Sequence, residues 1–309
     1  MNTVPRLFIE SVCLCLLDRR SLRESTKIPS AWGQICTATR KKIHTLRVFL
    51  DGEKKKIYAA AQPPLLYDAY SSATSLDSVD PKFVTNFWIE TCSTYGHRKL
   101  PSSYKEITLF NLKRLLHLIR PSRNERPPLC YDNTSLNTLK LKNGSQWING
   151  KLLSMRPPAD SVDLVLDEEC EGAEEFFAST GPLYHVHYEG PTLKRSTVDA
   201  LIEKFVPIEG GYFNMHQSFS YNQQKKLFEK CVVANKKVRV YVLSEKSTKS
   251  SDLVGLVDYI KYYSKKEVLR QGKIVIFSNE EEEKLEFRMS RSCNRWLLWD
   301  WYHRSQSKL

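Results

Sequence analysis

The chemistry open to this sequence is limited by how few reactive side chains it brings together. His185 and His187 are two residues apart in an alternating stretch, so both should point to one face of a strand. Neutral imidazoles bind zinc and other transition metals, but a site needs further donors. Val186 between them fits the alternation of an ordinary strand. We do not expect a nearby cysteine or carboxylate to complete a metal site. Cys92 and His97 are no better supported, so we expect no metal and no cofactor.

The cysteines are scattered along the chain. None forms a Cys-x-x-Cys pair, and no two close pairs have zinc-finger spacing, which is typical of reduced thiols in a cytosolic or nuclear protein. Arg6, Glu10 and Asp18 interrupt the apolar N-terminal residues, so we expect no secretory signal. No apolar run approaches the ~20 residues that cross a bilayer, and we expect no membrane segment. The eight cysteines are Cys13, Cys15, Cys36, Cys92, Cys130, Cys170, Cys231 and Cys293.

Motifs of nucleophilic or phosphate chemistry are missing from the sequence. It contains no G-x-S-x-G elbow, no H-E-x-x-H and no G-x-x-x-x-G-K-[ST] loop. Gly210-Gly211 before Tyr212 is a turn, too short to cradle a phosphate. We therefore expect a protein that is not an enzyme and has no catalytic residue.

Composition and charge indicate a folded globular protein with a basic first half. The 309 residues are 41% hydrophobic and 27% charged, with a net charge of +12. Residues 1–60 contribute +7, residues 61–160 contribute +5, and residues 161–309 are neutral. This distribution favours an acidic protein, a nucleic acid or an anionic membrane as partner, or a basic surface that keeps the protein soluble.

Nucleic-acid binding is the alternative that the basic residues leave open. Arg40-Lys41-Lys42 and Lys54-Lys55-Lys56 flank one predicted hairpin, where they could contact phosphates. Aromatic residues that would stack on bases are not interleaved with them, apart from Phe49 and Tyr58, which fit a core. Nucleic acid is therefore an unlikely partner, and we expect no membrane partner either.

Periodic apolar residues predict alternating helices and strands. Helices are predicted over 4–36, 81–91, 112–119, 147–155, 197–205, 221–235 and 252–264. A hairpin is predicted over 43–61 around Asp51-Gly52, and a second one pairs 274–277 with 285–289. Further strands are predicted at 107–109, 136–141, 162–166, 185–189 and 238–243.

Four of the predicted strands are regularly spaced. They begin near residues 107, 136, 162 and 186, so successive starts are 24 to 29 residues apart. Leucine-rich repeats have periods of about 20–29 residues, although their regular Asn or Cys is missing here. The sequence thus predicts an α/β fold, with a body over 41–309 that is either leucine-rich-repeat-like or an irregular α/β domain.

The N-terminal residues resemble an F-box, the three-helix module that docks on the adaptor subunit of cullin–RING ubiquitin ligases. The usual pattern opens with Leu-Pro and runs through spaced apolar positions to a tryptophan. More broadly, segments 4–35, 46–60 and 294–302 resemble the nematode-expanded F-box-like protein families. The positions that carry the F-box likeness are Val4, Pro5, Phe8, Val12, Leu16, Leu22, Ile28 and Trp32.

This resemblance implies a non-catalytic receptor with two parts. An F-box-like module over 1–40 would bind the adaptor, and the body would bind an unknown target protein and bring it to the ligase. Arg19, Arg20 and Arg23 could steer an acidic adaptor. A structural interaction module that has lost adaptor binding is the blander alternative. The expected adaptor-binding residues are Pro5, Leu7, Phe8, Val12, Leu16, Leu22 and Trp32.

The end of the chain is dense in aromatic residues. One interpretation is that this segment closes the end of the sheet and shields its last edge. The other is a target-binding patch, since Trp and Tyr are frequent in binding hot spots. The candidates for such a patch are Trp296, Trp299, Trp301 and Tyr302.

Overall fold

A computed structural model provides the coordinates, and the chain divides into two compact units, residues 1–181 (unit 1) and 182–309 (unit 2). Within the described part of the chain, no helix has the length and apolar character needed to cross a bilayer. The structure describes residues 4–16, 19–63, 72–91, 100–119, 127–244, 259–270, 273–281, 284–291 and 296–303.

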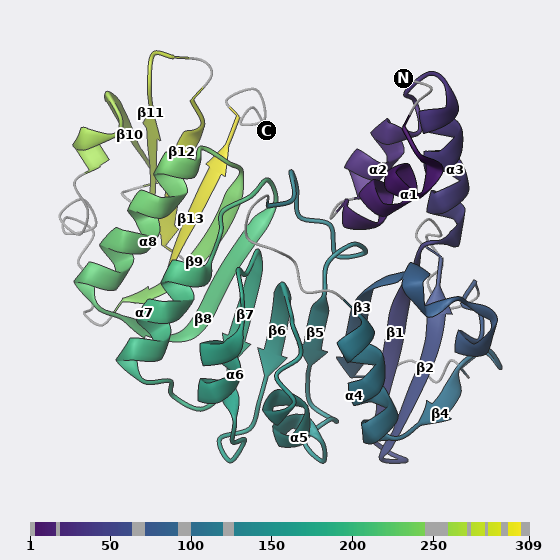
Figure 1. The fold of residues 1–309 in the computed structure, drawn as a ribbon. Helices are drawn as coiled ribbons and strands as arrows, with labels where there is room; N and C mark the ends of the chain where they lie inside the picture. The colour runs from purple at the N-terminus through teal and green to yellow at the C-terminus, as the bar shows by residue number, and fades with distance from the viewer. Residues whose placement is uncertain are drawn as a thin grey trace. The chain divides into compact units, whose positions relative to one another are not determined.

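Unit 1 begins with three short helices, which we call the N-terminal module (Figure 1). A small core of apolar residues, centred on Ile9, Cys13 and Cys36, holds these helices together. Gly33 allows the third helix to pass close to the preceding turn, because a Cβ at this position would lie 2.2 Å from Ile28 O. The helices are α1 (Arg6–Cys15), α2 (Arg19–Ser25) and α3 (Ala31–Lys42).

Arg19 fastens the module to the sheet of unit 1. Its Nη2 donates to Thr45 Oγ1 at 3.3 Å, to Asn86 Oδ1 at 3.2 Å and to Thr134 O at 3.4 Å. Its backbone N–H donates to Ser135 Oγ at 3.2 Å. Burial lowers the pKa of Arg19 to about 10. Arg19 therefore points into the protein, and the expectation that it steers an adaptor from the surface is wrong for this residue.

The strands of unit 1 combine an antiparallel hairpin with a parallel series. The predicted hairpin is confirmed, because β1 and β2 pair antiparallel from Thr45↔Gln62 to Asp51↔Lys56. β3, β5 and β6 add to β1 in parallel, and β4 pairs with β2. The strands are β1 (His44–Asp51), β2 (Lys56–Gln62), β3 (Val84–Thr91), β4 (Lys105–Ile107), β5 (Thr138–Leu141) and β6 (Ser161–Val165).

The helix predicted over 81–91 is wrong. Asp80 does cap a turn, since its carboxylate accepts from Lys82 N, but this turn is a 3₁₀ helix that ends at Phe83. The chain then continues as β3, with Phe87 and Ile89 buried. Phe87 and Ile89 pair in register with Leu46 and Val48 of β1, so tertiary packing selects the strand.

The helices that follow in unit 1 lie near their predicted positions, with one addition. The Thr108 side chain accepts from Asn111 N, so α4 starts directly after β4 and includes Leu109, which we had placed in the strand. The predicted helix over 147–155 is confirmed as α5. α6 was not predicted. The helices are α4 (Leu109–Leu118), α5 (Asn149–Ser154) and α6 (Ala173–Ser179).

Unit 2 is a sheet in the order β7-β8-β9-β13-β12-β11-β10. β7, β8 and β9 run parallel, and the other strands follow antiparallel. α7 (Arg195–Lys204) and α8 (Tyr221–Ala234) connect the parallel strands and lie over one face (Figure 1). The strands are β7 (His185–Glu189), β8 (Gly211–Phe219), β9 (Val238–Ser244), β10 (Lys265–Leu269), β11 (Ile274–Ser278), β12 (Glu286–Arg291) and β13 (Trp296–Tyr302).

The predictions for unit 2 are confirmed where a strong period and a cap coincide. The helix predicted near 221–235 begins after Ser220, whose side chain and Gln223 form a capping box. The second hairpin is confirmed as β11 and β12. β8, β10 and β13 were not predicted as strands. Most of the helix predicted over 252–264 lies outside the described residues, and the described part contains only a 3₁₀ turn, Tyr259–Lys261.

An aromatic core fills the helix-covered side of unit 2. Phe228 of α8 lies at its centre, with ring centroids 4.9 Å from Tyr259, 5.2 Å from Phe287 and 5.8 Å from Trp299. Tyr263 accepts a hydrogen bond from Trp301 Nε1 at 3.0 Å. The buried face therefore carries large aromatic side chains, and the polar residues of these strands alternate to the opposite face.

Candidate functional site

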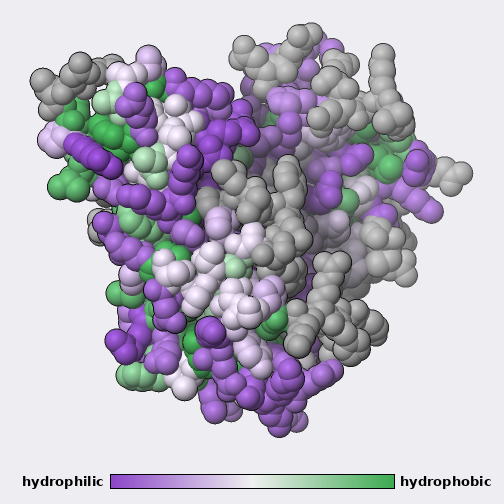
Figure 2. Space-filling model, turned by 90° about the vertical axis from the view of Figure 1, so that its right-hand side faces the viewer, coloured by the Kyte–Doolittle hydropathy of each residue, from purple (hydrophilic) through white to green (hydrophobic). Residues whose placement is uncertain are grey.

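Two adjacent apolar side chains on α1 remain exposed to solvent. Leu7 is 75% exposed and Phe8 is 55% exposed. Ile9 and Cys13, four residues apart on the other side of the helix, fill the core of the module. On the side of the chain drawn in Figure 2, hydrophobic residues form separate patches among hydrophilic ones. Leu7 and Phe8 are therefore large apolar side chains left on the surface of α1, and we call this pair the α1 patch.

The structure divides the remaining predicted adaptor-binding residues between core and surface. Pro5 is exposed, and Val12, Leu16 and Trp32 are half-buried. Leu16 and Trp32 pack against the module's own core. Leu22 is only 1% exposed within that core, so its expected role as a binding residue is wrong. Its position on a short helix gave no indication of which side faces inward.

The module also exposes several basic residues, of which Arg6 directly precedes the α1 patch in the sequence. Arg6, Arg20 and Arg23 are exposed, whereas Arg19 is engaged with the sheet. Lys27 pairs with Glu24 at 2.7 Å. The module therefore has an excess of positive charge on its surface that complements an acidic partner.

The thiols in the module provide a test of its fold. Cys13 Sγ donates to Cys36 Sγ at 3.1 Å, and both side chains are buried. Burial, together with this hydrogen bond, raises the pKa of Cys13 to about 12, so the reactive thiolate is scarce near neutral pH. Cys15, two residues further along α1, is exposed.

We expect iodoacetamide to alkylate Cys15 in the native protein and to leave Cys13 unmodified until the module unfolds. The reason is that Cys13 combines burial with a raised pKa, whereas Cys15 is open to solvent. Peptide mass spectrometry over a time course measures both rates in one sample. Equal rates at the two cysteines under native conditions would show that the core of the module is open.

Unit 2 offers a second surface, the face of its sheet opposite α7 and α8, which we call the open face. Strand alternation places every second side chain there, and most of these are exposed or half-buried. Asn214 and Asp300 are buried by their neighbours on this face. Other members are His187, Glu189, Tyr212, His216, Arg239, Tyr241, Arg288, Trp296, Leu298 and Tyr302.

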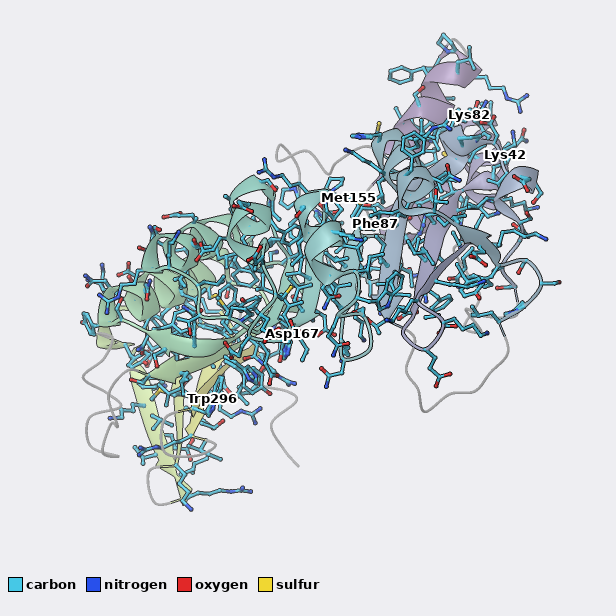
Figure 3. All side chains as sticks on the ribbon, turned by 90° about the horizontal axis from the view of Figure 1, so that it is seen from below. Lys42, Lys82, Phe87, Met155, Asp167 and Trp296 are labelled. Carbon is cyan, nitrogen blue, oxygen red and sulfur yellow. The ribbon has the colours of Figure 1, made fainter. Side chains whose placement is uncertain are left out.

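The C-terminal aromatics are divided by the same alternation. Trp299 and Trp301 are buried against α8 and its aromatic partners, so the expectation that they bind a target is wrong. Trp296 (Figure 3) and Tyr302 are half-buried on the open face. The expected cap over the last edge is also wrong, because β13 pairs with both β9 and β12. Beyond β12 the sheet continues through β11 to β10.

A pocket of about 450 Å³ lies at the end of the open face formed by Gly210, Gly211 and Tyr212. Two arginines share one carboxylate there, since Asp300 lies 2.6 Å from Arg288 Nη2 and 3.6 Å from Arg239 Nε. Burial, followed by the negative charge of Glu286, raises the pKa of Tyr302 to about 12, so its phenol is neutral at physiological pH. The pocket therefore presents hydrogen-bond donors and aromatic surface.

Three side chains with donor atoms suited to a metal ion, which we did not predict as a group from the sequence, lie together on the open face. His187 and Glu189 of β7 meet His216 of β8, with candidate ligand atoms within 4.8 Å of one another. His216 Nδ1 is 3.5 Å from Glu189 Oε2. The spacing His187-x-Glu189 was a usable sequence signal, but His216 comes from a strand that we had not predicted. His185 lies on the same face and stacks on Tyr212.

Three lysines of the two basic clusters, Lys42, Lys54 and Lys56, have contacts with other side chains of unit 1. Lys54 and Lys56 each approach a carboxylate, that of Asp51 at 3.9 Å and that of Glu106 at 2.7 Å respectively. Lys42 Nζ lies 5.1 Å from the centre of the Phe83 ring, and Lys82 Nζ lies 4.8 Å from it (Figure 3). These contacts engage the four lysines with neighbouring carboxylates and with the Phe83 ring.

Comparisons of the chain with family models, with curated proteins and with solved structures found no match. Functional conclusions about this chain therefore depend on its own residues and geometry.

Proposed function

We propose that this protein is a non-catalytic receptor that docks on the adaptor of a cullin–RING ubiquitin ligase through the α1 patch. The observation that carries the proposal is the exposure of Leu7 and Phe8, while the module already has its own core of Ile9, Cys13 and Cys36. A helix that exposes two large apolar side chains beside basic residues suits an acidic partner with an apolar groove.

The F-box-like interpretation agrees with further local features. α3 begins at Ala31, so Pro29 lies in the turn before it and does not break the helix. Arg19 holds the module against the sheet of unit 1. A module that binds an adaptor needs such an attachment, because it must hold the remainder of unit 1 in a defined position. Burial of one Leu or Phe contributes roughly 1.5–3 kcal/mol, so the α1 patch could supply a useful part of the affinity.

The body would bind the target protein. Its parallel strands β5, β6, β7, β8 and β9 begin at residues 138, 161, 185, 211 and 238, so the starts are 23 to 27 residues apart. This period supports a leucine-rich-repeat-like body. The open face of unit 2 carries arginine, tyrosine and Trp296, residue types that are enriched in protein-binding hot spots.

Binding of the purified chain to a purified cullin–RING adaptor, measured by calorimetry, tests the proposal. We expect Phe8→Asp to weaken binding at least tenfold, because a charge replaces a buried anchor worth about 1.5–3 kcal/mol. Leu118→Asp is the matched control. Leu118 lies on α4, and its exposed fraction of 58% is close to the 55% of Phe8. This control should bind like the wild type.

Two results would contradict the proposal. One is a wild-type protein that does not bind the adaptor although its Cys13 is protected from alkylation, which shows a folded module. The other is an equal loss of affinity for Phe8→Asp and Leu118→Asp, which would show that the α1 patch is not the contact.

A further inference from the structure

His187, Glu189 and His216 carry nitrogen and oxygen atoms of the kind that bind metals, and they come from two neighbouring strands. β7 and β8 are parallel and paired, with His187 in register with Asn214 and Tyr188 with Met215. Glu189 and His216 each follow the last of these pairs by one position, on the side that faces away from α7 and α8. The register therefore places Glu189 and His216 side by side, with His187 two residues earlier on the same face of the sheet.

The distances suit closure around one ion. The candidate ligand atoms of the three residues all lie within 4.8 Å of one another, and His216 Nδ1 is 3.5 Å from Glu189 Oε2. The His187 and His216 rings meet edge to face, with centroids 5.5 Å apart. Zinc at about 2.0–2.2 Å from nitrogen and oxygen ligands requires only small side-chain rotations from this arrangement.

Neighbouring side chains orient the two imidazoles. The Trp296 ring packs edge to face on His216 with centroids 5.1 Å apart. Asn214 Nδ2 lies 3.2 Å from His187 Nδ1 and 3.1 Å from the hydroxyl of Tyr212. Metal-binding histidines commonly have such a second hydrogen-bonded partner at their other ring nitrogen.

Asn214 lies next to His187 and can orient its imidazole ring. Its side chain is buried, and its Oδ1 has no hydrogen-bond partner among the described residues. A half-turn of the amide brings Oδ1 to the position of Nδ2, where it accepts a hydrogen bond from the N–H of His187 Nδ1. The lone pair of the neutral ring is then on Nε2, the atom through which His187 would coordinate a metal.

We propose that His187, Glu189 and His216 bind a zinc ion on the open face of unit 2, with Asn214 as a positioning residue. Two imidazoles and one carboxylate are a donor set that zinc accepts, and an exposed site leaves a coordination position for water. Zinc bound here bridges β7 and β8. This inference does not depend on adaptor docking, because all of its residues lie in unit 2.

Competition with a chromogenic chelator, on tag-free full-length protein and with zinc itself as the probe, tests the site. We expect His216→Ala and Glu189→Gln each to weaken zinc binding by at least about 10–100-fold. Replacing a residue that only hydrogen-bonds to a metal ligand already causes a loss of this size. His117→Ala is the matched control, since His117 is an exposed histidine on α4 outside the group. It should retain wild-type affinity.

X-ray absorption of the loaded wild-type protein should show nitrogen ligands at about 2.0–2.1 Å, with an imidazole signature that falls in His216→Ala. Asn214→Leu should weaken zinc binding about 10–100-fold while the absorption spectrum retains both imidazoles, which separates a positioning role from a ligand role. The proposal is overturned if wild type, His216→Ala and Glu189→Gln bind zinc equally. It is overturned as well if sulfur dominates the spectrum, since the binding site would then be the cysteines.

Discussion

Replacing Phe228 by alanine is expected to lower the free energy of unfolding of unit 2 by about 3–5 kcal/mol. Phe228 is fully buried, and its ring contacts Tyr259, Phe287 and Trp299 at centroid distances of 4.9, 5.2 and 5.8 Å. The substitution removes these contacts and leaves a cavity between α8 and the sheet. Edge-to-face aromatic pairs add about 0.5–1.5 kcal/mol each beyond the area that they bury.

The effect should be confined to the core. Val233→Ala, on the same helix but at a side chain that is 80% exposed, should change stability by less than about 0.5 kcal/mol. Hydrogen exchange followed by mass spectrometry, with chemical denaturation of the same samples, localises the loss to peptides of unit 2. An equal response to the two substitutions would contradict the aromatic core as the main source of stability in this unit.

Glu90→Ala is expected to destabilise unit 1 by about 3–5 kcal/mol, far more than removal of an ordinary ion pair. Arg47 Nη2 lies 2.6 Å from Glu90 Oε1, and the two side chains are only 8% and 15% exposed. The Arg47 guanidinium also lies over the Trp88 ring, 4.4 Å from its centre. Without Glu90, this guanidinium keeps its charge in an enclosed, largely apolar place.

Lys56 and Glu106 provide the matched control for burial. They approach to 2.7 Å, nearly the same distance, but are 43% and 53% exposed. Glu106→Ala should therefore cost at most about 1 kcal/mol. The double replacement Arg47→Met with Glu90→Leu should be less damaging than Glu90→Ala alone, because no unpaired charge remains. Equal denaturation midpoints for Glu90→Ala and Glu106→Ala would contradict this account.

The two surfaces that we propose for binding differ in how visible they were in the sequence. Leu7 and Phe8 were identified because apolar residues recur along the first helix, and the structure leaves both exposed. The zinc group was missed, although His187 and Glu189 are two residues apart, because its third member lies on β8. The sequence pattern around Tyr212 showed a turn and not a nine-residue strand.

Elements were predicted well where local signals agreed with one another. Ser220 and Gln223 mark the start of α8, and alternating valines mark β9. These features depend on residues that are neighbours in the chain. The wrong prediction over 81–91 had equally good local signals, a cap and a proline, but pairing with β1 outweighed them. Intrinsic helical preference is small compared with the burial of a whole strand.

The amino-acid sequence alone determined that this is an α/β protein with a basic, helical N-terminus, because periodicity, caps and charge are written in neighbouring residues. Only the tertiary structure decided which apolar residues are core and which are surface. Leu22 is enclosed whereas Phe8 is exposed, and Trp301 is enclosed whereas Trp296 reaches the open face. Arg19 and His216 likewise acquire their partners from strands remote in the chain. Burial and ligand geometry depend on which distant segments pack together, and the spacing of neighbouring residues does not determine that packing.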